Sequence, residues 1–305
     1  MCSNGRAHRL GGPHARWQYD TCDTCQHRWL TPMPTVDELR EYYNGAYSVP
    51  RERYAARARQ AYPATRALLA SGGIGTGRVL EIGCSYGELL ASFAADGWQV
   101  RGIEIDQRAC TEAAARLGGG VLCGTLEDFI ATSPTERFDA VVAFHVVEHI
   151  VDPRAFLRQA LGLLRPGGVL LLKTPNAASL VSRLAAGWWE WASPPEHVHL
   201  FSARSITAAL REAGATSIAI SSRSGDANRP LFEFARSTVR RALRRPAGGA
   251  HYAAGTVPLS HRGWYRSARA VDDLLELPID RLLATVSRGE RQLGAELTIV
   301  ARAAS

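Results

Sequence analysis

The sequence contains little lysine, few cysteines and no long apolar run. Lysine occurs only at Lys173, among 36 basic residues. No apolar stretch of about 18 residues is present, so no transmembrane helix is expected. The six cysteines are spread over 305 residues without the dense spacing of a disulfide framework, and the polar N-terminus shows no secretory signal. These absences favour a protein of the reducing cytoplasm.

The net charge of +7 therefore comes almost entirely from arginine. Much of it is scattered, which fits the codon bias of a GC-rich genome better than a basic binding surface. The alternative is an anionic partner or a membrane surface. With 46% hydrophobic and 21% charged residues the composition is that of a globular protein, and the length suffices for one large domain or two small ones.

The most informative segment is residues 77–106, which indicates a strand, a glycine turn, a helix and a second strand. Gly83 and Gly87 frame the turn and let a ligand approach the backbone. Glu104 lies near the end of the second strand, about 20 residues later, where nucleotide-binding βαβ units place the carboxylate that binds the ribose hydroxyls. The segment predicts the first half of such a unit.

The turn indicates which nucleoside ligand is held. A dinucleotide site has the pattern G-x-G-x-x-G, whereas here the spacing is Gly83-x-x-x-Gly87, with Ser85 in the middle. Glu81 precedes the turn, and a carboxylate there would repel a pyrophosphate. It suits a ligand with an ammonium group and no phosphate, such as S-adenosylmethionine (SAM).

The pattern E-x-G-x-x-x-G followed by G-I-E-I-D resembles the first two motifs of class I SAM-dependent methyltransferases, many of which have glycine in place of Ser85. Four later segments continue the resemblance, which is to ubiquinone-pathway O-methyltransferases and sugar C-methyltransferases and spans roughly residues 75–225. They are Val121–Asp128, the strand Phe138–Phe144 with the following H-V-V-E-H, the "LLxPGG"-like Leu163–Leu170, and Pro195–Ser202.

The resemblance implies an α/β fold with a Rossmann-like, seven-stranded, mostly parallel sheet and helices on both faces. It implies that the SAM-binding residues lie in the loops that follow the strands. These residues are Glu81, Gly83, Cys84, Ser85, Tyr86, Gly87, Glu104, Ile105, Asp106, Thr125, Leu126, Glu127 and His145.

Candidate catalytic residues follow the fourth strand. Methyl transfer is an in-line displacement that depends mainly on positioning, but a hydroxyl or carbon acceptor must also lose a proton to a base. His149 is a candidate base, with His145 and Glu148 beside it. These three residues could instead hold a divalent metal, or Glu148 and His149 could merely cap the next helix.

Candidate acceptor residues follow the fifth strand: Trp191, Glu196, His197 and His199. Aromatic and polar groups at this density suit an organic-acceptor pocket, and His197 is also a catalytic candidate. The alternative is that the tryptophans fill an apolar seam and His199 satisfies a backbone carbonyl. Because the fourth and fifth strands are neighbours in the resembled fold, we expect His149 and residues 196–199 to line one pocket.

The N-terminal piece carries a C-x-x-C knuckle at Cys22 and Cys25. It resembles the zinc-binding N-terminus of certain sugar C-methyltransferases, which has two knuckles; here the first is reduced to Cys2. The candidate ligands of a structural zinc are therefore Cys2, Cys22 and Cys25. An upstream start of the chain or a decayed zinc site would explain the missing cysteine.

Four regions are expected. They are a Cys/His-containing cap (1–50), a SAM-binding core (51–225), a helical insertion (226–293) and the last core strand (294–305). The insertion contains an arginine-rich amphipathic stretch within 231–245, which suits a lid, a dimer helix or a membrane-surface element.

The resulting hypothesis is a SAM-dependent methyltransferase acting on oxygen or carbon of a small organic acceptor, such as a sugar, lipid-linked or natural-product intermediate. A SAM-binding protein without catalysis is the alternative. A nucleic-acid methyltransferase is less favoured, because the base-amino methyltransferase motif after the fourth strand and an RNA-binding module are both missing. We expect no specific nucleic-acid partner; peripheral membrane contact and a homodimer stay open.

Overall fold

A computed structural model of the chain describes residues 6–12, 16–45, 51–223, 237–238, 241–242 and 292–303. Cys2 and nearly all of the predicted 226–293 insertion lie outside these residues. The chain forms two compact units. The first unit comprises Met1–Val49, Thr174–Ile206 and Ile220–Thr298, and the second comprises Pro50–Lys173, Thr207–Ala219 and Ile299–Ser305. Within the described residues, no helix combines the length and apolarity needed to cross a membrane.

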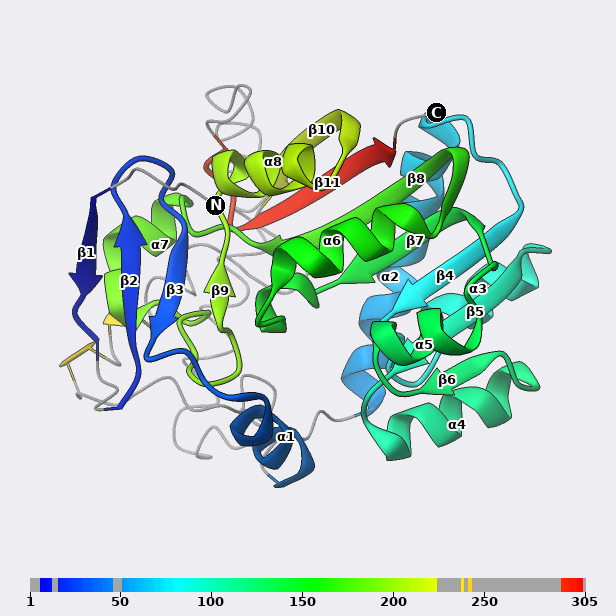
Figure 1. Ribbon diagram of the computed structural model, residues 1–305, viewed down its shortest axis with the longest axis horizontal. Coiled ribbons are helices and arrows are strands. Elements are labelled where there is room, and N and C mark those ends of the chain that lie inside the picture. The colour runs from blue at the N-terminus through cyan, green and yellow to red at the C-terminus, as the bar shows by residue number, and fades with distance from the viewer. Residues whose placement is uncertain are drawn as a thin grey trace, which may run out of the picture. The chain divides into compact units, whose positions relative to one another are not determined.

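A seven-stranded sheet lies mainly in the second unit and has the order β10-β11-β8-β7-β4-β5-β6 (Figure 1). The pairs β4–β5, β4–β7, β5–β6 and β7–β8 are parallel, so the predicted mostly parallel sheet is confirmed. The strands are β4 (Arg78–Ile82), β5 (Gln99–Glu104), β6 (Val121–Cys123), β7 (Phe138–Phe144), β8 (Leu164–Pro175), β10 (Ala215–Arg223) and β11 (Glu296–Ala303).

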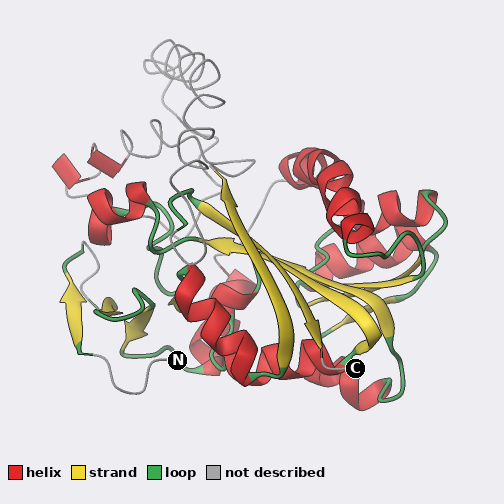
Figure 2. Ribbon diagram, turned by 90° about the horizontal axis from the view of Figure 1, so that it is seen from above, coloured by secondary structure: helices red, strands yellow, loops and turns green. Residues whose placement is uncertain are grey.

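Helices lie on both faces of this sheet (Figure 2). They are α2 (Arg51–Ser71), α3 (Glu88–Ala95), α4 (Gln107–Leu117), α5 (Leu126–Thr132), the 3₁₀ helix η1 (Val147–His149), α6 (Pro153–Gly162) and α8 (Ala203–Glu212). Short polar side chains start several of them: Asp106 accepts from the N–H of Ala109, and Asp152 caps α6, which has Pro153 in its first turn. Helix α2 is continuous through Pro63.

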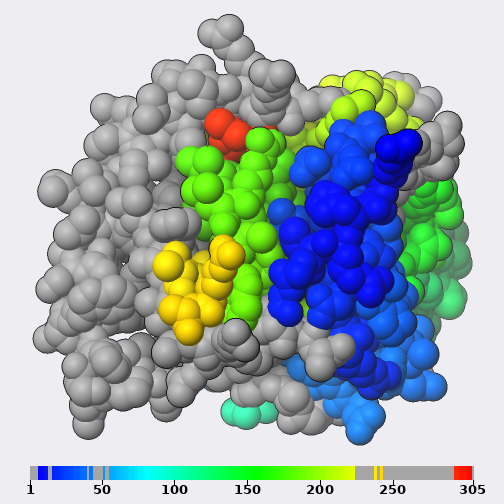
Figure 3. All heavy atoms as spheres, turned by 90° about the vertical axis from the view of Figure 1, so that its left-hand side faces the viewer, coloured from blue at the N-terminus to red at the C-terminus, as the bar shows by residue number. Residues whose placement is uncertain are grey.

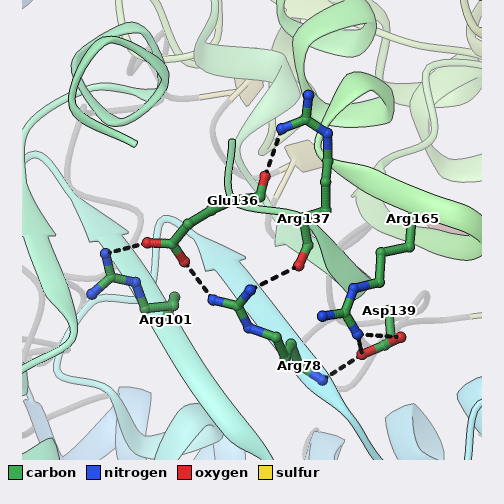
Figure 4. Close-up of polar contacts among 6 residues, drawn as sticks. All are labelled: Arg78, Arg101, Glu136, Arg137, Asp139 and Arg165. Carbon is green, nitrogen blue, oxygen red and sulfur yellow. Dashed lines mark hydrogen bonds and ion pairs between the residues drawn. The ribbon is translucent and has the colours of Figure 1, made fainter. Parts of the chain in front are cut away.

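A polar network links the amino ends of the central strands (Figure 4). Glu136 pairs with both Arg78 (2.6 Å) and Arg101 (2.9 Å). Asp139 accepts a 2.6 Å hydrogen bond from the backbone N–H of Arg78 and pairs with Arg165 at 3.0 Å. Each carboxylate is thus shared between two partners from different segments, which fixes the register of β4 against its neighbours and leaves the carboxyl ends of the strands to form the site.

The first unit contains a four-stranded sheet with the order β1-β2-β3-β9 (Figure 1). Its strands are β1 (Ala7–Leu10), β2 (Gln18–Cys22), β3 (Arg28–Thr31) and β9 (His199–Leu200), and its helices are α1 (Val36–Gly45), α7 (Leu180–Ala185) and η2 (Ala186–Trp188). Tyr19, Leu30, Trp189 and Val198 belong to one buried cluster. In Figure 3 the blue N-terminal residues lie beside the green residues of the segment after β8.

One disulfide, between Cys110 and Cys123, joins α4 to the end of β6. The spacing of the cysteines did not indicate this bridge. The two cysteines meet because α4 packs beside β6, which brings together positions whose spacing resembles no disulfide pattern. The cellular compartment stays a prediction.

Candidate cofactor and acceptor sites

The glycine turn between β4 and α3 adopts left-handed backbone conformations. Gly83 has φ 75°, Gly87 has φ 74° and Ser85 has φ 48°, a region that favours glycine. This explains physically why a glycine suits the position of Ser85. A Cβ added to Gly83 would lie 2.6 Å from Cγ2 of Val146, so the turn after β4 lies close against the loop after β7.

Glu81 provides the test of whether the turn fits SAM. Its carboxylate is buried, and among the described residues its Oε2 has no hydrogen-bond partner. Burial, with added repulsion from Glu104 and Glu88, raises the pKa of Glu81 well above its ordinary value. A buried acceptor without a donor is matched by a ligand that brings positive donors, and the ammonium group of SAM does so.

Glu104 connects the turn to the loop after β5. Its Oε2 accepts a 2.7 Å hydrogen bond from the N–H of Ser85, and its Oε1 accepts a 2.8 Å bond from the N–H of Asp106. The next side chain, Ile105, is 57% exposed and offers an apolar surface. A carboxylate and an exposed apolar side chain in sequence suit a ribose and its base.

The loop after β6 completes this edge of the sheet. The N–H of Gly124 donates to the carbonyl of Glu104 at 2.9 Å, which links the two loops. Thr125 then begins α5 through a capping box with Asp128, Leu126 is buried and Glu127 is exposed. Elsewhere in the turn Cys84 is buried, which raises the pKa of its thiol, and its contact with the cofactor stays a prediction.

The predicted catalytic residues follow β7 in the same unit. His145 has φ 55°, and its N–H donates to the carbonyl of Lys173 at 2.9 Å. Its Nδ1 lies 3.3 Å from Oε1 of the buried Glu148. His149 ends η1 and is half-buried, and Glu148 and His149 offer ligand atoms within 4.8 Å of each other. The structure therefore groups these three residues, while base and metal roles stay predictions.

Comparison with known proteins agrees with this geometry. A methyltransferase domain model matches residues 51–220, more than half of the chain. The chain belongs to the methyltransferase family. It is similar to the ubiquinone biosynthesis O-methyltransferase of Bradyrhizobium sp. (strain ORS 278), with 40% identity over 106 residues, covering 32% of this chain and 40% of that protein. The corresponding Bradyrhizobium diazoefficiens protein is 36% identical over 116 residues, covering 36% and 44%.

The chain thus spans less than half the length of these curated relatives. A solved SAM-dependent methyltransferase from Archaeoglobus fulgidus is 19% identical, covers 88% of this chain and 99% of its own, and has a TM-score of 0.48. With the family model and the sheet order together, the chain is a class I SAM-dependent methyltransferase.

The predicted acceptor residues of this methyltransferase lie in the first unit and are buried. Glu196 is within 3.5 Å of the hydroxyls of Tyr42 and Ser193. His197 hydrogen-bonds the carbonyl of Trp191 at 2.7 Å and stacks on its ring. No pattern in the sequence indicated the contact between Tyr42 and Glu196.

His199 and the cysteine knuckle also belong to the first unit. His199 Nδ1 lies 3.2 Å from Nε2 of the buried His27. The knuckle is a tight turn in which the N–H of Cys22 donates to His27 and the N–H of Gln26 donates to Cys22. Cys25 accepts from Ser202. Within the described chain, Cys22 and Cys25 form no three-ligand metal group, and zinc stays a prediction because Cys2 lies outside it.

Proposed function

We propose that this methyltransferase transfers the methyl group of SAM to oxygen or carbon of a small organic acceptor, such as a sugar, lipid-linked or natural-product intermediate. The main supporting observation is at the carboxyl edge of the large sheet, where the buried Glu81 and the His145–His149 segment come from the neighbouring strands β4 and β7. Among the described residues, Oε2 of Glu81 has no hydrogen-bond partner. One edge of the sheet therefore supplies both a carboxylate for a cationic ligand and a base for the proton of the methyl acceptor.

The chain's residues have two tasks in such a reaction. SAM supplies a methyl group already activated on a sulfonium, so the first task is positioning, which we assign to Glu81, Glu104 and the glycine turn. The second is removal of the acceptor's proton, which we assign to His149. The carboxylate of Glu148 lies 3.3 Å from Nδ1 of His145. A divalent metal at His145, Glu148 and His149 is the alternative way to lower the acceptor's pKa.

The acceptor-binding role of Trp191, Glu196, His197 and His199 is part of the proposal. Buried carboxylate and imidazole groups beside an indole support recognition of a hydroxylated organic molecule. The curated relatives are named for O-methylation, which supports oxygen as the accepting atom. We also propose peripheral contact with a membrane or a lipid-linked acceptor, and a homodimer.

An acceptor screen tests the proposal. The purified full chain is incubated with methyl-labelled SAM and separate panels of catechols, sugars and nucleotide sugars, polyprenylated phenols, and nucleic acids. Transfer to a small hydroxyl or activated carbon supports the proposal, and His149→Ala should then remove it while the matched surface variant His8→Ala keeps it. Binding of S-adenosylhomocysteine (SAH), the demethylated product of SAM, without methyl transfer in any panel would favour a SAM-binding protein without catalysis.

A further inference from the structure

Arg28 of the first unit is a buried cation with no ion pair among the described residues. Only 3% of its surface is exposed, and among the described residues its Nε and Nη1 have no hydrogen-bond partner. Burial lowers the pKa of Arg28 to about 10; the phenol of Tyr19 opposes this shift and the charge of Arg183 adds to it. An isolated buried charge is strongly unfavourable, so a compensating anion is to be expected.

The arginines of the second unit show the usual arrangement. Arg78 and Arg101 share the carboxylate of Glu136, and Arg165 pairs with Asp139 (Figure 4). These guanidinium groups are also more exposed than that of Arg28. The difference matters because a guanidinium is always charged near neutral pH, and solvent can compensate an exposed one but not a buried one.

A second unsatisfied donor lies directly opposite Arg28. Thr21 of β2 pairs in register with Arg28 of β3, and opposed residues of antiparallel strands project from the same face of the sheet. Thr21 is buried, and its Oγ1 has no hydrogen-bond partner among the described residues. One hydroxyl and two guanidinium nitrogens therefore occupy one face of the sheet, and none of them has a hydrogen-bond acceptor among the described residues.

An aromatic wall borders these donors. The Cζ atom of Arg28 lies 5.7 Å from the centre of the Trp189 ring, and Trp189 is buried in the cluster that also contains Leu30. An indole beneath a planar guanidinium restricts its orientation, while the N–H donors along the guanidinium edge stay available to a ligand. Because its edge donors suit two acceptor oxygens, the matching ligand is an oxyanion, phosphate or carboxylate.

We propose that Thr21 and Arg28, over Trp189, form an oxyanion-binding site that holds a phosphate or carboxylate group of the methyl acceptor. The link to the acceptor rests on the proposed function, and it is supported by Tyr19, which lies beside Arg28 on the same sheet. The Tyr19 hydroxyl donates a 2.6 Å hydrogen bond to the carbonyl of His197, one of the candidate acceptor residues. The substrate class is therefore an acidic acceptor, such as a phosphorylated or carboxylated small molecule.

The first experiment measures melting temperature in inorganic phosphate and in acetate, each against chloride at equal ionic strength. Phosphate or acetate should raise the melting temperature of the full chain by about 2–4 °C, and the more effective anion identifies the group. Arg28→Met and Thr21→Val should lose this shift. The matched control Arg9→Met, which removes an exposed arginine paired with Asp20 on the same sheet, should keep it.

The ligand-free variants separate binding from structure. If Arg28 serves a ligand, Arg28→Met removes an uncompensated buried charge, and the melting temperature in chloride should stay equal or rise. The proposal is wrong if Arg28→Met melts more than about 5 °C lower than the parent in chloride and still shows the anion-induced shift. It is also wrong if the parent and Thr21→Val respond equally to the anions. The anion response does not depend on methyl transfer. A negative acceptor screen therefore does not contradict the oxyanion site, and a missing anion response does not contradict methyl transfer.

Discussion

Glu104 accepts a 2.7 Å hydrogen bond from the backbone N–H of Ser85, so one carboxylate holds the left-handed turn after β4 as well as the loop after β5. Glu104→Ala is expected to weaken SAH binding by ~1–3 kcal/mol, the typical effect of removing a charged hydrogen-bond partner. Titration calorimetry measures this, with Glu212→Ala, a surface change in the same unit, as the control. Equal affinity in both variants would place the ribose-binding carboxylate elsewhere.

Glu81 predicts opposite pH dependences of stability and of ligand affinity. Its pKa lies well above the ordinary 4.5, so between pH 4.5 and the raised value the folded chain binds more protons than the unfolded chain. Stability contributed by this group therefore falls as the pH rises through that window. SAH affinity should rise over the same window, because the ionised carboxylate attracts the ammonium group.

The matched variant for this prediction is Glu81→Gln. It should flatten both pH profiles and weaken SAH binding near neutral pH. Melting temperatures and calorimetric titrations at several pH values give the two profiles. Unchanged slopes in Glu81→Gln would assign the pH dependence to another group.

The second unit could be predicted largely from sequence, because its determinants are local. A short apolar strand, a glycine turn and a carboxylate at fixed spacing identify the βαβ unit, and the structure places Glu81, Gly83 and Glu104 at one edge of the sheet. The sheet of the first unit could not be predicted in this way. Strand β9 pairs with β3, which lies far from it in the sequence. A strand of two residues also has no recognisable sequence pattern of its own.

The burial of Arg28 was equally hidden from sequence reasoning. An arginine on a strand normally faces solvent, and only the alternation of buried positions in β3, shared by Arg28 and Leu30, reveals that it faces the core. The Cys110–Cys123 bridge also depends on helix packing rather than on spacing. Non-local contacts of this kind require the tertiary structure.

Reduction of the Cys110–Cys123 bridge should lower stability. The bridge joins residues separated by 13 positions, and cross-linking a loop of this size stabilises a fold by roughly 3 kcal/mol through the unfolded chain. Dithiothreitol should therefore lower the melting temperature by several degrees. Cys110→Ala/Cys123→Ala should show the lower value with or without reductant; the same response to reductant in this variant would point to another cysteine pair.

Zinc binding at the knuckle should not affect the cofactor. Cys22 and Cys25 belong to the first unit, whereas the glycine turn and Glu104 belong to the second. In the double variant Cys22→Ser/Cys25→Ser we expect loss of any zinc found in the parent by metal analysis, with SAH affinity unchanged. Loss of SAH binding in a variant with an intact circular dichroism spectrum would contradict this.

His149 should affect turnover rather than stability. It ends η1, where its backbone N–H donates to Val146, a bond that His149→Ala leaves in place. If the imidazole removes the acceptor's proton, the variant should lose about 100-fold or more in rate with SAH affinity nearly unchanged. If it only caps the helix, the variant should instead lose ~0.5–2 kcal/mol of stability and keep its rate per folded molecule. Turnover and melting temperature measured on one preparation separate the two roles, and His145→Ala, which removes an imidazole 3.3 Å from Glu148, shows whether the base acts alone.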